Sequence, residues 1–232
     1  MRILAFDTST EWCSVALGDG PTWHVRDEHA GQRHSERLLP MIEAMLADAG
    51  WTLTQLDAVA FGAGPGSFTG IRIACGVAQG LAFGAALPVV PIPTLAAIAQ
   101  DAFRERGWRH VVACIDARMR EIYIAAYERA GDAWREAILP SVMPPAEVLR
   151  SMLDRHDWRG GGNGFGVYPA VASQLDLVEV APALRPTARA IGELALPSVG
   201  PGKGLTAADA LPLYVRHRVA LTADEVKAGI RL

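Results

Sequence analysis

Cysteine is scarce in this sequence, and the few cysteines present lie far apart. The 232-residue chain contains three, Cys13, Cys75 and Cys114, each inside an apolar segment. An odd count without CxxC or CxxxH spacing is not typical of a disulfide framework or of a zinc site. We therefore expect three buried thiols that act as small hydrophobic side chains in a reducing compartment, and no metal site.

Excess charge and long hydrophobic runs are lacking as well. The net charge is only −3, so the chain has no basic surface of the kind that binds nucleic acid directly, and a partner would have to supply one. The longest apolar stretch, residues 71–92, is Gly-rich and is interrupted by Arg72 and two prolines, so we expect no membrane span. The N-terminus has the pattern of a strand rather than of a signal peptide, and the expected location is cytoplasmic.

The common motifs of nucleotide-binding and hydrolytic enzymes are absent. GPGKG at 200–204 contains Lys203 but has neither the glycine spacing nor the Ser or Thr of a Walker A motif. GAGPGS at 62–67 is not GxGxxG, and no acidic residue follows at the ribose-binding distance. There is no HExxH and no GxSxG, and none of the six histidines lies in a motif that identifies a base for Ser67.

The pattern of the first hairpin recurs in the second half of the chain. In both places an apolar strand ends at an aspartate, Asp7 or Asp116, and a polar turn and a second apolar strand follow. Each predicted hairpin is followed later by a Gly-rich loop, GAGPG in the first half and GGGNG at 160–164. The strands of the two predicted hairpins are residues 2–7, 13–17, 110–116 and 122–126.

Apolar periodicity and glycine stops predict the remaining elements. They are a strand at 23–30, a helix at 34–49, a strand at 56–62, an apolar helix after residue 67, a strand at 88–92 and helices at 94–106 and 188–196. We therefore predict an α/β fold of two similar subdomains, each with a mixed sheet flanked by helices, at residues 1–104 and 105–232. The last twenty residues are predicted to form an irregular tail laid back across the body.

The first Gly-rich loop permits two interpretations. Glycines before a helix can expose backbone N–H groups to a phosphate, and a carboxylate at a strand end can orient a metal-bound phosphate. The same glycines can also let two elements pack backbone to backbone, and each aspartate can cap its own turn. The candidate residues for an anion or nucleotide site are Asp7, Gly64, Gly66, Ser67 and Thr69.

The helix after this loop carries Gly76, Gly80 and Gly84 at four-residue spacing. A glycine inside a helix is less favourable than alanine by about 1 kcal/mol, so three of them suggest close approach of another element. That neighbour lies either within the chain or on another protein. The helix at 34–49 is the candidate neighbour within the chain. His34 at its start is expected to be neutral, in a packing or hydrogen-bonding role.

Four segments carry a resemblance to a known family. FDTST, HSERLLPMIEAML, GPGSFTGIRIACGVAQGLA and PLYVRHRVA resemble the bacterial TsaB (YeaZ) family, and the similarity runs over the whole chain. It implies a duplicated fold of the ASKHA type (actin, sugar kinase, Hsp70), in agreement with the internal repeat. It also implies a role in forming N6-threonylcarbamoyladenosine at position 37 of ANN-decoding tRNAs, as the non-catalytic partner of TsaD beside TsaE and a threonylcarbamoyl-AMP synthase.

One departure bears on catalysis. TsaD-like proteins hold a metal through two histidines of an NHxEGH stretch, and the corresponding positions here are Thr94 and Ile98. Neither residue replaces an imidazole ligand, so the resemblance implies a chain that does not transfer the threonylcarbamoyl group itself. ATP or ADP is then expected only in the complex with TsaD and TsaE. An ASKHA-type phosphotransferase or a glycoprotease-like hydrolase is the alternative.

The resemblance also implies a protein interface. In the family, the helix containing HSERLLP and the helix after GPGSFTG form the surface for homodimers and for TsaD. Contact with tRNA would then be indirect, and the sequence leaves open whether the chain alone is a monomer or a homodimer. The candidate interface residues are His34, Leu38, Ile42, Met45, Ile73, Gly76, Val77 and Gly80.

Overall fold

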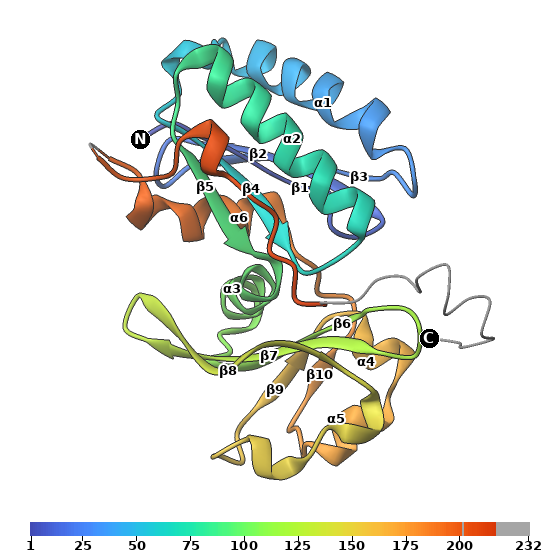
Figure 1. Ribbon diagram of the computed structural model, residues 1–232. Coiled ribbons are helices and arrows are strands. Elements are labelled where there is room, and N and C mark those ends of the chain that lie inside the picture. The colour runs from blue at the N-terminus through green and yellow to red at the C-terminus, as the bar shows by residue number, and fades with distance from the viewer. Residues whose placement is uncertain (201, 217–232) are drawn as a thin grey trace, which may run out of the picture.

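Two five-stranded sheets, one in each lobe, organise the chain (Figure 1). The computed structural model describes residues 1–200 and 202–216. The spatial strand orders are β3-β2-β1-β4-β5 and β10-β9-β6-β7-β8. In both sheets the first hairpin strand pairs antiparallel with its successor and parallel with a later strand, β4 or β9. The predicted pair of mixed sheets is therefore confirmed.

The first sheet is formed by β1 (Ile3–Asp7), β2 (Trp12–Gly18), β3 (Trp23–His29), β4 (Ala58–Gly64) and β5 (Val89–Pro93). The second is formed by β6 (His110–Asp116), β7 (Ile122–Ala130), β8 (Ala133–Met143), β9 (Arg159–Gly161) and β10 (Val180–Ala181). The helices are α1 (His34–Ala49), α2 (Phe68–Ala85), α3 (Thr94–Arg106), α4 (Gly164–Val167), α5 (Ala170–Gln174) and α6 (Ala188–Ala195).

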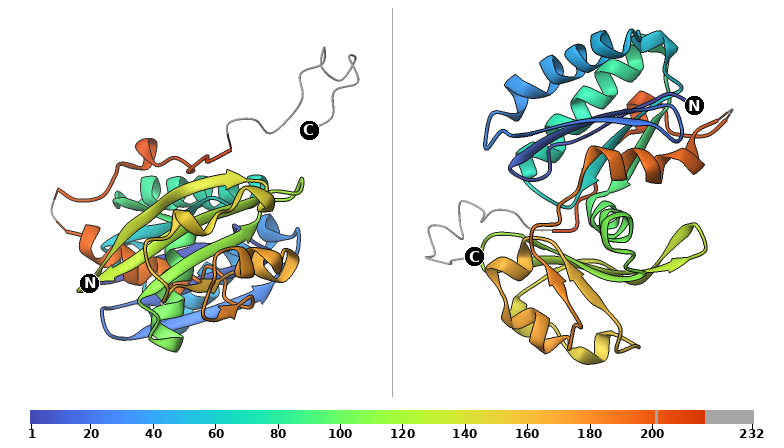
Figure 2. Two further views of the ribbon diagram at one scale, coloured as in Figure 1. Left: turned by 90° about the horizontal axis from the view of Figure 1, so that it is seen from below. Right: turned by 180° about the vertical axis from the view of Figure 1, so that it is seen from behind.

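The sheets and helices stack in layers that the strand alternation explains. Successive strand residues point to opposite faces of a sheet. In β1, Leu4 and Phe6 belong to the core under α1 and α2, whereas Ile3 and Ala5 belong to the core under α6. The second sheet likewise lies between α3 on one face and the short helices α4 and α5 on the other. Figure 2 shows α3 between the two sheets from behind.

The helices do not follow the predicted boundary at residue 104. The strands do, because the first sheet ends at Pro93 and the second begins at His110. Helix α6, however, comes from the second half of the chain and packs on β1 and β2 of the first sheet. Ala5, Ala58 and Ala60 leave room there for Ile191, which is fully buried. The first lobe is therefore completed by a segment that the sequence assigned to the second.

Helix α2 has a buried alanine face and an open glycine face. Ala74, Ala78 and Ala82 lie in the core against the first sheet. By length and composition, α2 is also the one helix in the described part of the chain that could cross a membrane. Its alanine face is occupied by the packing of the first lobe, as in a core helix of a globular domain.

Candidate functional site

Both hairpin turns open onto one cleft between the lobes. The cleft has a volume of about 770 Å³, and segments from distant parts of the chain line it. They include residues 9–11 after β1, residues 65–69 at the start of α2, residues 115–118 at the end of β6, and residues 213–216 near the end of the described chain. The duplicated hairpins thus place their two turns on opposite sides of one site.

Asp7 lies beneath this cleft rather than on its surface. Its side chain is fully buried, and its Oδ1 accepts hydrogen bonds from the Ser9 N–H (3.0 Å) and the Ser9 hydroxyl (2.8 Å). Its Oδ2 has no hydrogen-bond partner among the described residues. Burial raises the pKa of Asp7 to about 7, although the Ser9 hydrogen bonds oppose the shift. Asp7 therefore caps its own turn, and nothing in its geometry presents it to a ligand in the cleft.

Asp116 occupies the equivalent place in the second lobe and does line the cleft. Its Oδ1 accepts a hydrogen bond from the Arg118 N–H (3.0 Å), the same two-residue cap that Asp7 forms with Ser9. Its Oδ2 forms an ion pair with the Arg118 guanidinium at 3.3 Å. The two aspartates are thus alike in their backbone role and different in exposure and charge pairing.

The first Gly-rich loop packs backbone to backbone with the turn after β1. The Ser67 N–H donates to the Ser9 carbonyl oxygen (2.8 Å), and the Ser67 hydroxyl accepts from Gly70 N–H as the cap of α2. A Cβ at Gly66 would lie 2.5 Å from the Ser9 carbonyl oxygen, and one at Gly70 would overlap the Thr8 carbonyl oxygen. These glycines are required by close packing. Gly66, Ser67 and Thr69 still line the cleft, and an anion site there stays a prediction.

The second Gly-rich loop repeats this packing. A Cβ at Gly162 would overlap the Cys114 carbonyl oxygen, and one at Gly164 would overlap the Cys114 side chain. Asn163 in the same loop accepts a hydrogen bond through its Oδ1 from the Asp116 N–H (3.0 Å). The loop therefore turns tightly against the end of β6, and Asn163 forms part of the cleft wall.

Half of the predicted interface residues are in the interior. Leu38, Ile42 and Met45 of α1 are 1%, 1% and 5% exposed and belong to the core between the helices and the first sheet. The apolar face of α1 is covered by the chain's own sheet, so these side chains offer little surface to a partner, and their place at an interface stays a prediction. His34 is also buried, and it lines the cleft. Burial lowers the pKa of His34, which agrees with the expected neutral ring.

The other half, on α2, is open or partly open. Gly76 and Gly80 are exposed, and Ile73 and Val77 are partly buried. A Cβ built at Gly76, Gly80 or Gly84 would meet no atom within 4 Å. Within the described part of the chain, the glycine stripe is therefore not a contact between helices. Phe83 stands beside it with 84% of its surface exposed.

Thr94 and Ile98, which align with the metal-binding histidines of TsaD-like proteins, have structural roles. The Thr94 hydroxyl donates to the Pro65 carbonyl oxygen (2.5 Å), which ties α3 to the loop before α2. Ile98 is fully buried in the core between α3 and the second sheet. Among residues 1–200 and 202–216, no group of three His, Cys, Asp or Glu side chains has metal-binding geometry.

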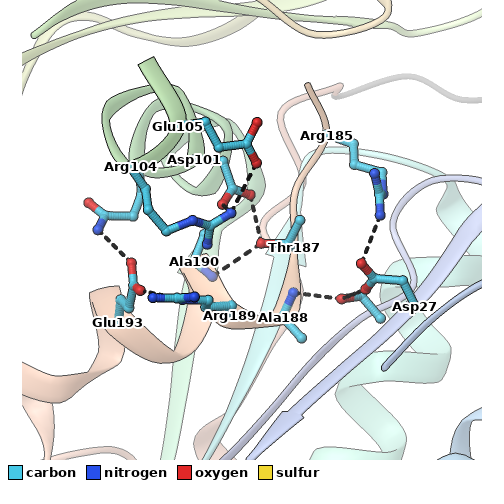
Figure 3. Close-up of polar contacts among 12 residues, drawn as sticks. Asp27, Asp101, Arg104, Glu105, Arg185, Thr187, Ala188, Arg189, Ala190 and Glu193 are labelled. Atoms are coloured by element: carbon cyan, nitrogen blue, oxygen red, sulfur yellow. Dashed lines mark hydrogen bonds and ion pairs between the residues drawn. The ribbon is translucent and has the colours of Figure 1, made fainter. Parts of the chain in front are cut away.

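A buried polar network joins the lobes behind the cleft (Figure 3). The Thr187 hydroxyl caps α6 by accepting from the Ala190 N–H (3.2 Å), and it donates to Asp101 of α3 (2.6 Å). Arg104 forms an ion pair with Asp101. Burial raises the pKa of Asp101 to about 7, against the opposing effect of Arg104. Nothing in the sequence pattern pointed to this network, because its members are 86 residues apart.

Sequence reasoning also missed two arginines of the cleft. Arg118 reaches across to Glu11 of the first lobe at 3.1 Å, and Arg216 donates to the Ala117 carbonyl oxygen (3.0 Å). The turn position of Arg118, two residues after Asp116 in the repeated hairpin, was the available signal. Arg216 gave none, since its contacts depend on the path of the last described residues.

Two mixed sheets of one repeated plan, flanked by helices and facing each other across a cleft, define a protein of the duplicated ASKHA-type α/β class. The family profile described as "TsaD: tRNA N6-adenosine threonylcarbamoyltransferase" matches residues 25–157. The tRNA threonylcarbamoyladenosine biosynthesis protein TsaB of Escherichia coli K12 is 40% identical over 223 residues, which cover 95% of this chain and 96% of that protein. Its namesake from Haemophilus influenzae is 42% identical over 228 residues (94% and 95%).

Solved structures agree. One titled "YeaZ from Pseudomonas aeruginosa" is 41% identical, with a TM-score of 0.83 over 92% of this chain and 99% of that chain. A second, titled as an uncharacterized protein from Pseudomonas aeruginosa with similarity to peptidase YEAZ, is 42% identical, with a TM-score of 0.86 over 93% and 99%. The chain belongs to the TsaB (YeaZ) family, and its role lies in tRNA threonylcarbamoyladenosine biosynthesis.

Proposed function

We propose that this chain is the non-catalytic partner that binds and activates TsaD in the threonylcarbamoyl transfer to ANN-decoding tRNAs. The observation that carries the proposal is the open glycine stripe of α2. Gly76, Gly80 and Gly84 each disfavour the helix by about 1 kcal/mol relative to alanine, and no packing among residues 1–200 and 202–216 compensates for this cost. A partner helix that approaches the α2 backbone closely would do so, with the exposed Phe83 as its apolar anchor.

The residues at the metal-ligand positions support the non-catalytic part of the proposal. Neither residue supplies an imidazole to a metal. The Thr94 hydroxyl is hydrogen-bonded to the Pro65 carbonyl oxygen, and the Ile98 side chain is buried in the core. On this proposal the transfer chemistry belongs to TsaD. ATP or ADP then enters only through the complex with TsaD and TsaE, tRNA is contacted indirectly, and the chain works in the cytoplasm, as a homodimer when TsaD is absent.

The test is association with TsaD from the same organism. Gly80→Leu places a bulky side chain in open space, so the fold is retained while a close-packed partner is excluded. We expect Gly80→Leu and Phe83→Ala each to weaken TsaD binding at least about tenfold, as at an interface hot spot, in isothermal titration calorimetry. Ser173→Leu, at an exposed position of α5 in the other lobe, is the matched control and should bind TsaD normally.

Reconstituted tRNA modification tests activation. TsaD, TsaE and the threonylcarbamoyl-AMP synthase should modify tRNA with this chain and lose most of that activity without it. Unchanged TsaD affinity in both α2 variants would remove the proposed interface. Modification of tRNA, hydrolysis of ATP or cleavage of a glycoprotein by the purified chain alone would contradict the non-catalytic role and favour a phosphotransferase or a glycoprotease-like hydrolase.

A further inference from the structure

Residues 210–216 cross from the first lobe to the second without helix or strand structure, and we propose that they form a releasable strap that closes one side of the cleft (Figure 1, red). Leu213, Tyr214, Val215 and Arg216 make up the wall of the cleft on this side. The inference concerns the isolated chain and does not rest on the proposed partnership with TsaD.

The strap is fixed to the first lobe at two points. The Ala210 carbonyl oxygen accepts hydrogen bonds from the Gln79 side chain (2.9 Å) and from the Cys75 thiol (3.4 Å), both on α2. Three residues later, the Leu213 N–H donates to the Ala63 carbonyl oxygen at the end of β4 (2.8 Å). Ala210 is fully buried, so the strap covers the α2 flank that contains Cys75.

Tyr214 extends the attachment to the start of α2, at the mouth of the cleft. Its hydroxyl accepts a hydrogen bond from Arg72 Nε (2.8 Å). The Arg72 guanidinium lies 3.7 Å from the centre of the Phe68 ring, and the Phe68 and Tyr214 rings are 6.1 Å apart. This stack stands beside the first Gly-rich loop, so the strap and the loop share one edge of the cleft.

Arg216 fixes the strap to the second lobe. Its guanidinium donates to the Ala117 carbonyl oxygen (3.0 Å) and pairs with Glu121, both in or next to the turn after β6. It also lies 5.6 Å from the Tyr123 ring. A segment bonded to α2 and β4 at one end and to the β6–β7 turn at the other connects the two lobes across their opening.

The strap is attached more weakly than the elements it joins. Leu211, Leu213 and Tyr214 are 67%, 38% and 45% exposed, so much of the apolar surface of these three side chains stays open to solvent. Its contacts are single hydrogen bonds rather than a ladder, and segments of this kind open at lower free energy than the core. Upstream, Leu205 exchanges two backbone hydrogen bonds of 2.9 Å with Val89 of β5. The strap can therefore lift while the chain before it stays in place.

The native cysteines provide the test. Cys75 lies under Ala210, whereas Cys13 and Cys114 are fully buried within the two sheets and serve as internal references. We expect Arg216→Ala, which removes charge-assisted bonds, to raise the rate of Cys75 alkylation by iodoacetamide about tenfold, measured by peptide mass spectrometry. The references should stay unchanged, and the peptide containing Leu213 should exchange its amide hydrogens faster.

Three further variants test whether Cys75 alkylation depends on the contacts of the strap. Glu121→Gln weakens the same anchor from the second lobe and should act in the same direction as Arg216→Ala. Tyr214→Phe removes one hydrogen bond and should give a smaller increase, about threefold. Arg26→Ala breaks an exposed ion pair with Asp48 elsewhere in the first lobe and should leave Cys75 alkylation unchanged.

Two outcomes would overturn the strap. In one, Cys75 reacts at the wild-type rate in both Arg216→Ala and Glu121→Gln. In the other, alkylation of all three cysteines accelerates together, which would show that residues 210–216 open only when both lobes unfold. Normal TsaD binding with either result would separate failure of the strap from failure of the proposed function.

Discussion

The turn after β1 and the turn after β6 begin alike and diverge at the side chain. In each, an aspartate at the strand end accepts a hydrogen bond from the backbone N–H two residues later, from Ser9 or from Arg118. In the first turn the second carboxylate oxygen is buried against Gly62 and has no partner among the described residues. In the second it faces the cleft and pairs with Arg118.

The difference between the two turns shows that the repeated hairpin needs only one oxygen of its aspartate, the one that caps the turn. An aspartate can cap either turn because only one carboxylate oxygen is needed for that purpose. The other oxygen takes whatever environment the surrounding lobe offers, and α6 closes over the first sheet near Asp7 whereas the cleft stays open near Asp116. Equivalent sequence positions therefore have similar structures and different electrostatics.

The largest expected loss of stability comes from a substitution in the second Gly-rich loop. Gly162→Ala should destabilise the protein by about 3 kcal/mol or more, because Gly162 has φ +116° and its Cβ would overlap the Cys114 backbone, which cannot rotate away. Urea unfolding followed by circular dichroism measures this change. Gly20→Ala, in the turn between β2 and β3 where φ is +113° and a Cβ meets nothing, isolates the contribution of positive φ alone. Equal losses in the two variants would contradict the close approach.

A glycine-to-alanine substitution in the first lobe should cost less stability, and a second substitution should relieve part of that loss. Gly62→Ala brings a methyl group against the Asp7 carboxylate, a side chain, and should lower the free energy of unfolding by about 2 kcal/mol. Asp7→Ala removes the obstacle, so the double variant should be more stable than the sum of the single losses predicts. Strict additivity in a double-mutant cycle would show that the two residues do not collide.

The buried aspartates Asp7 and Asp101 should make the free energy of unfolding depend on pH. The pKa of Asp7 is raised from 3.8 to about 7 in the folded state. Between these values the folded protein binds more protons than the unfolded chain, so stability falls as pH rises, by up to about 1.4 kcal/mol per pH unit. Asp101, with its pKa also raised to about 7, contributes in the same direction.

Asp7→Asn should therefore reduce the slope of unfolding free energy against pH between about pH 5 and pH 7, leaving the contribution of Asp101. Chemical denaturation of the wild-type protein and of Asp7→Asn at several pH values within this window gives both slopes. A wild-type slope in Asp7→Asn would mean that Asp7 is ionised in the folded protein.

The smallest effect is expected for the ion pair that crosses the cleft. Arg118 and Glu11 are 75% and 44% exposed, so solvent screens their attraction. Arg118→Ala should change the free energy of unfolding by no more than about 1 kcal/mol. A loss of several kcal/mol in thermal or urea unfolding would show that the second turn holds the lobes together through this pair.

Local sequence patterns predicted most of the elements. The hairpins, α1 to α3, α6 and the two mixed sheets are confirmed, because strand alternation, helical spacing and glycine stops act within one segment. The strands β8, β9 and β10 and the short helices α4 and α5 were not predicted, since they depend on packing within the second lobe. Of the predicted C-terminal tail, residues 217–232 lie outside the described part of the chain.

The faces of the helices could not be assigned in the same way. Helical spacing identified an apolar row on α1 and a glycine row on α2, and the resemblance placed both at an interface. The structure buries the row that contains Leu38 and Ile42 against the first sheet and leaves the glycine row open. An apolar face is equally satisfied by the chain's own sheet or by a partner, so periodicity alone does not distinguish the two.

The sequence by itself determined the duplication, the order of the elements and the family, because these follow from residue patterns along the chain. Only the tertiary structure decided that the loop GAGPGS packs on the turn after β1, that Asp7 is fully buried while Asp116 lines the cleft, and that residues 210–216 bridge the lobes. Each of these depends on contacts between residues far apart in the chain. The burial and hydrogen bonding of these residues depend on which surfaces pack together, and the local sequence does not determine this packing.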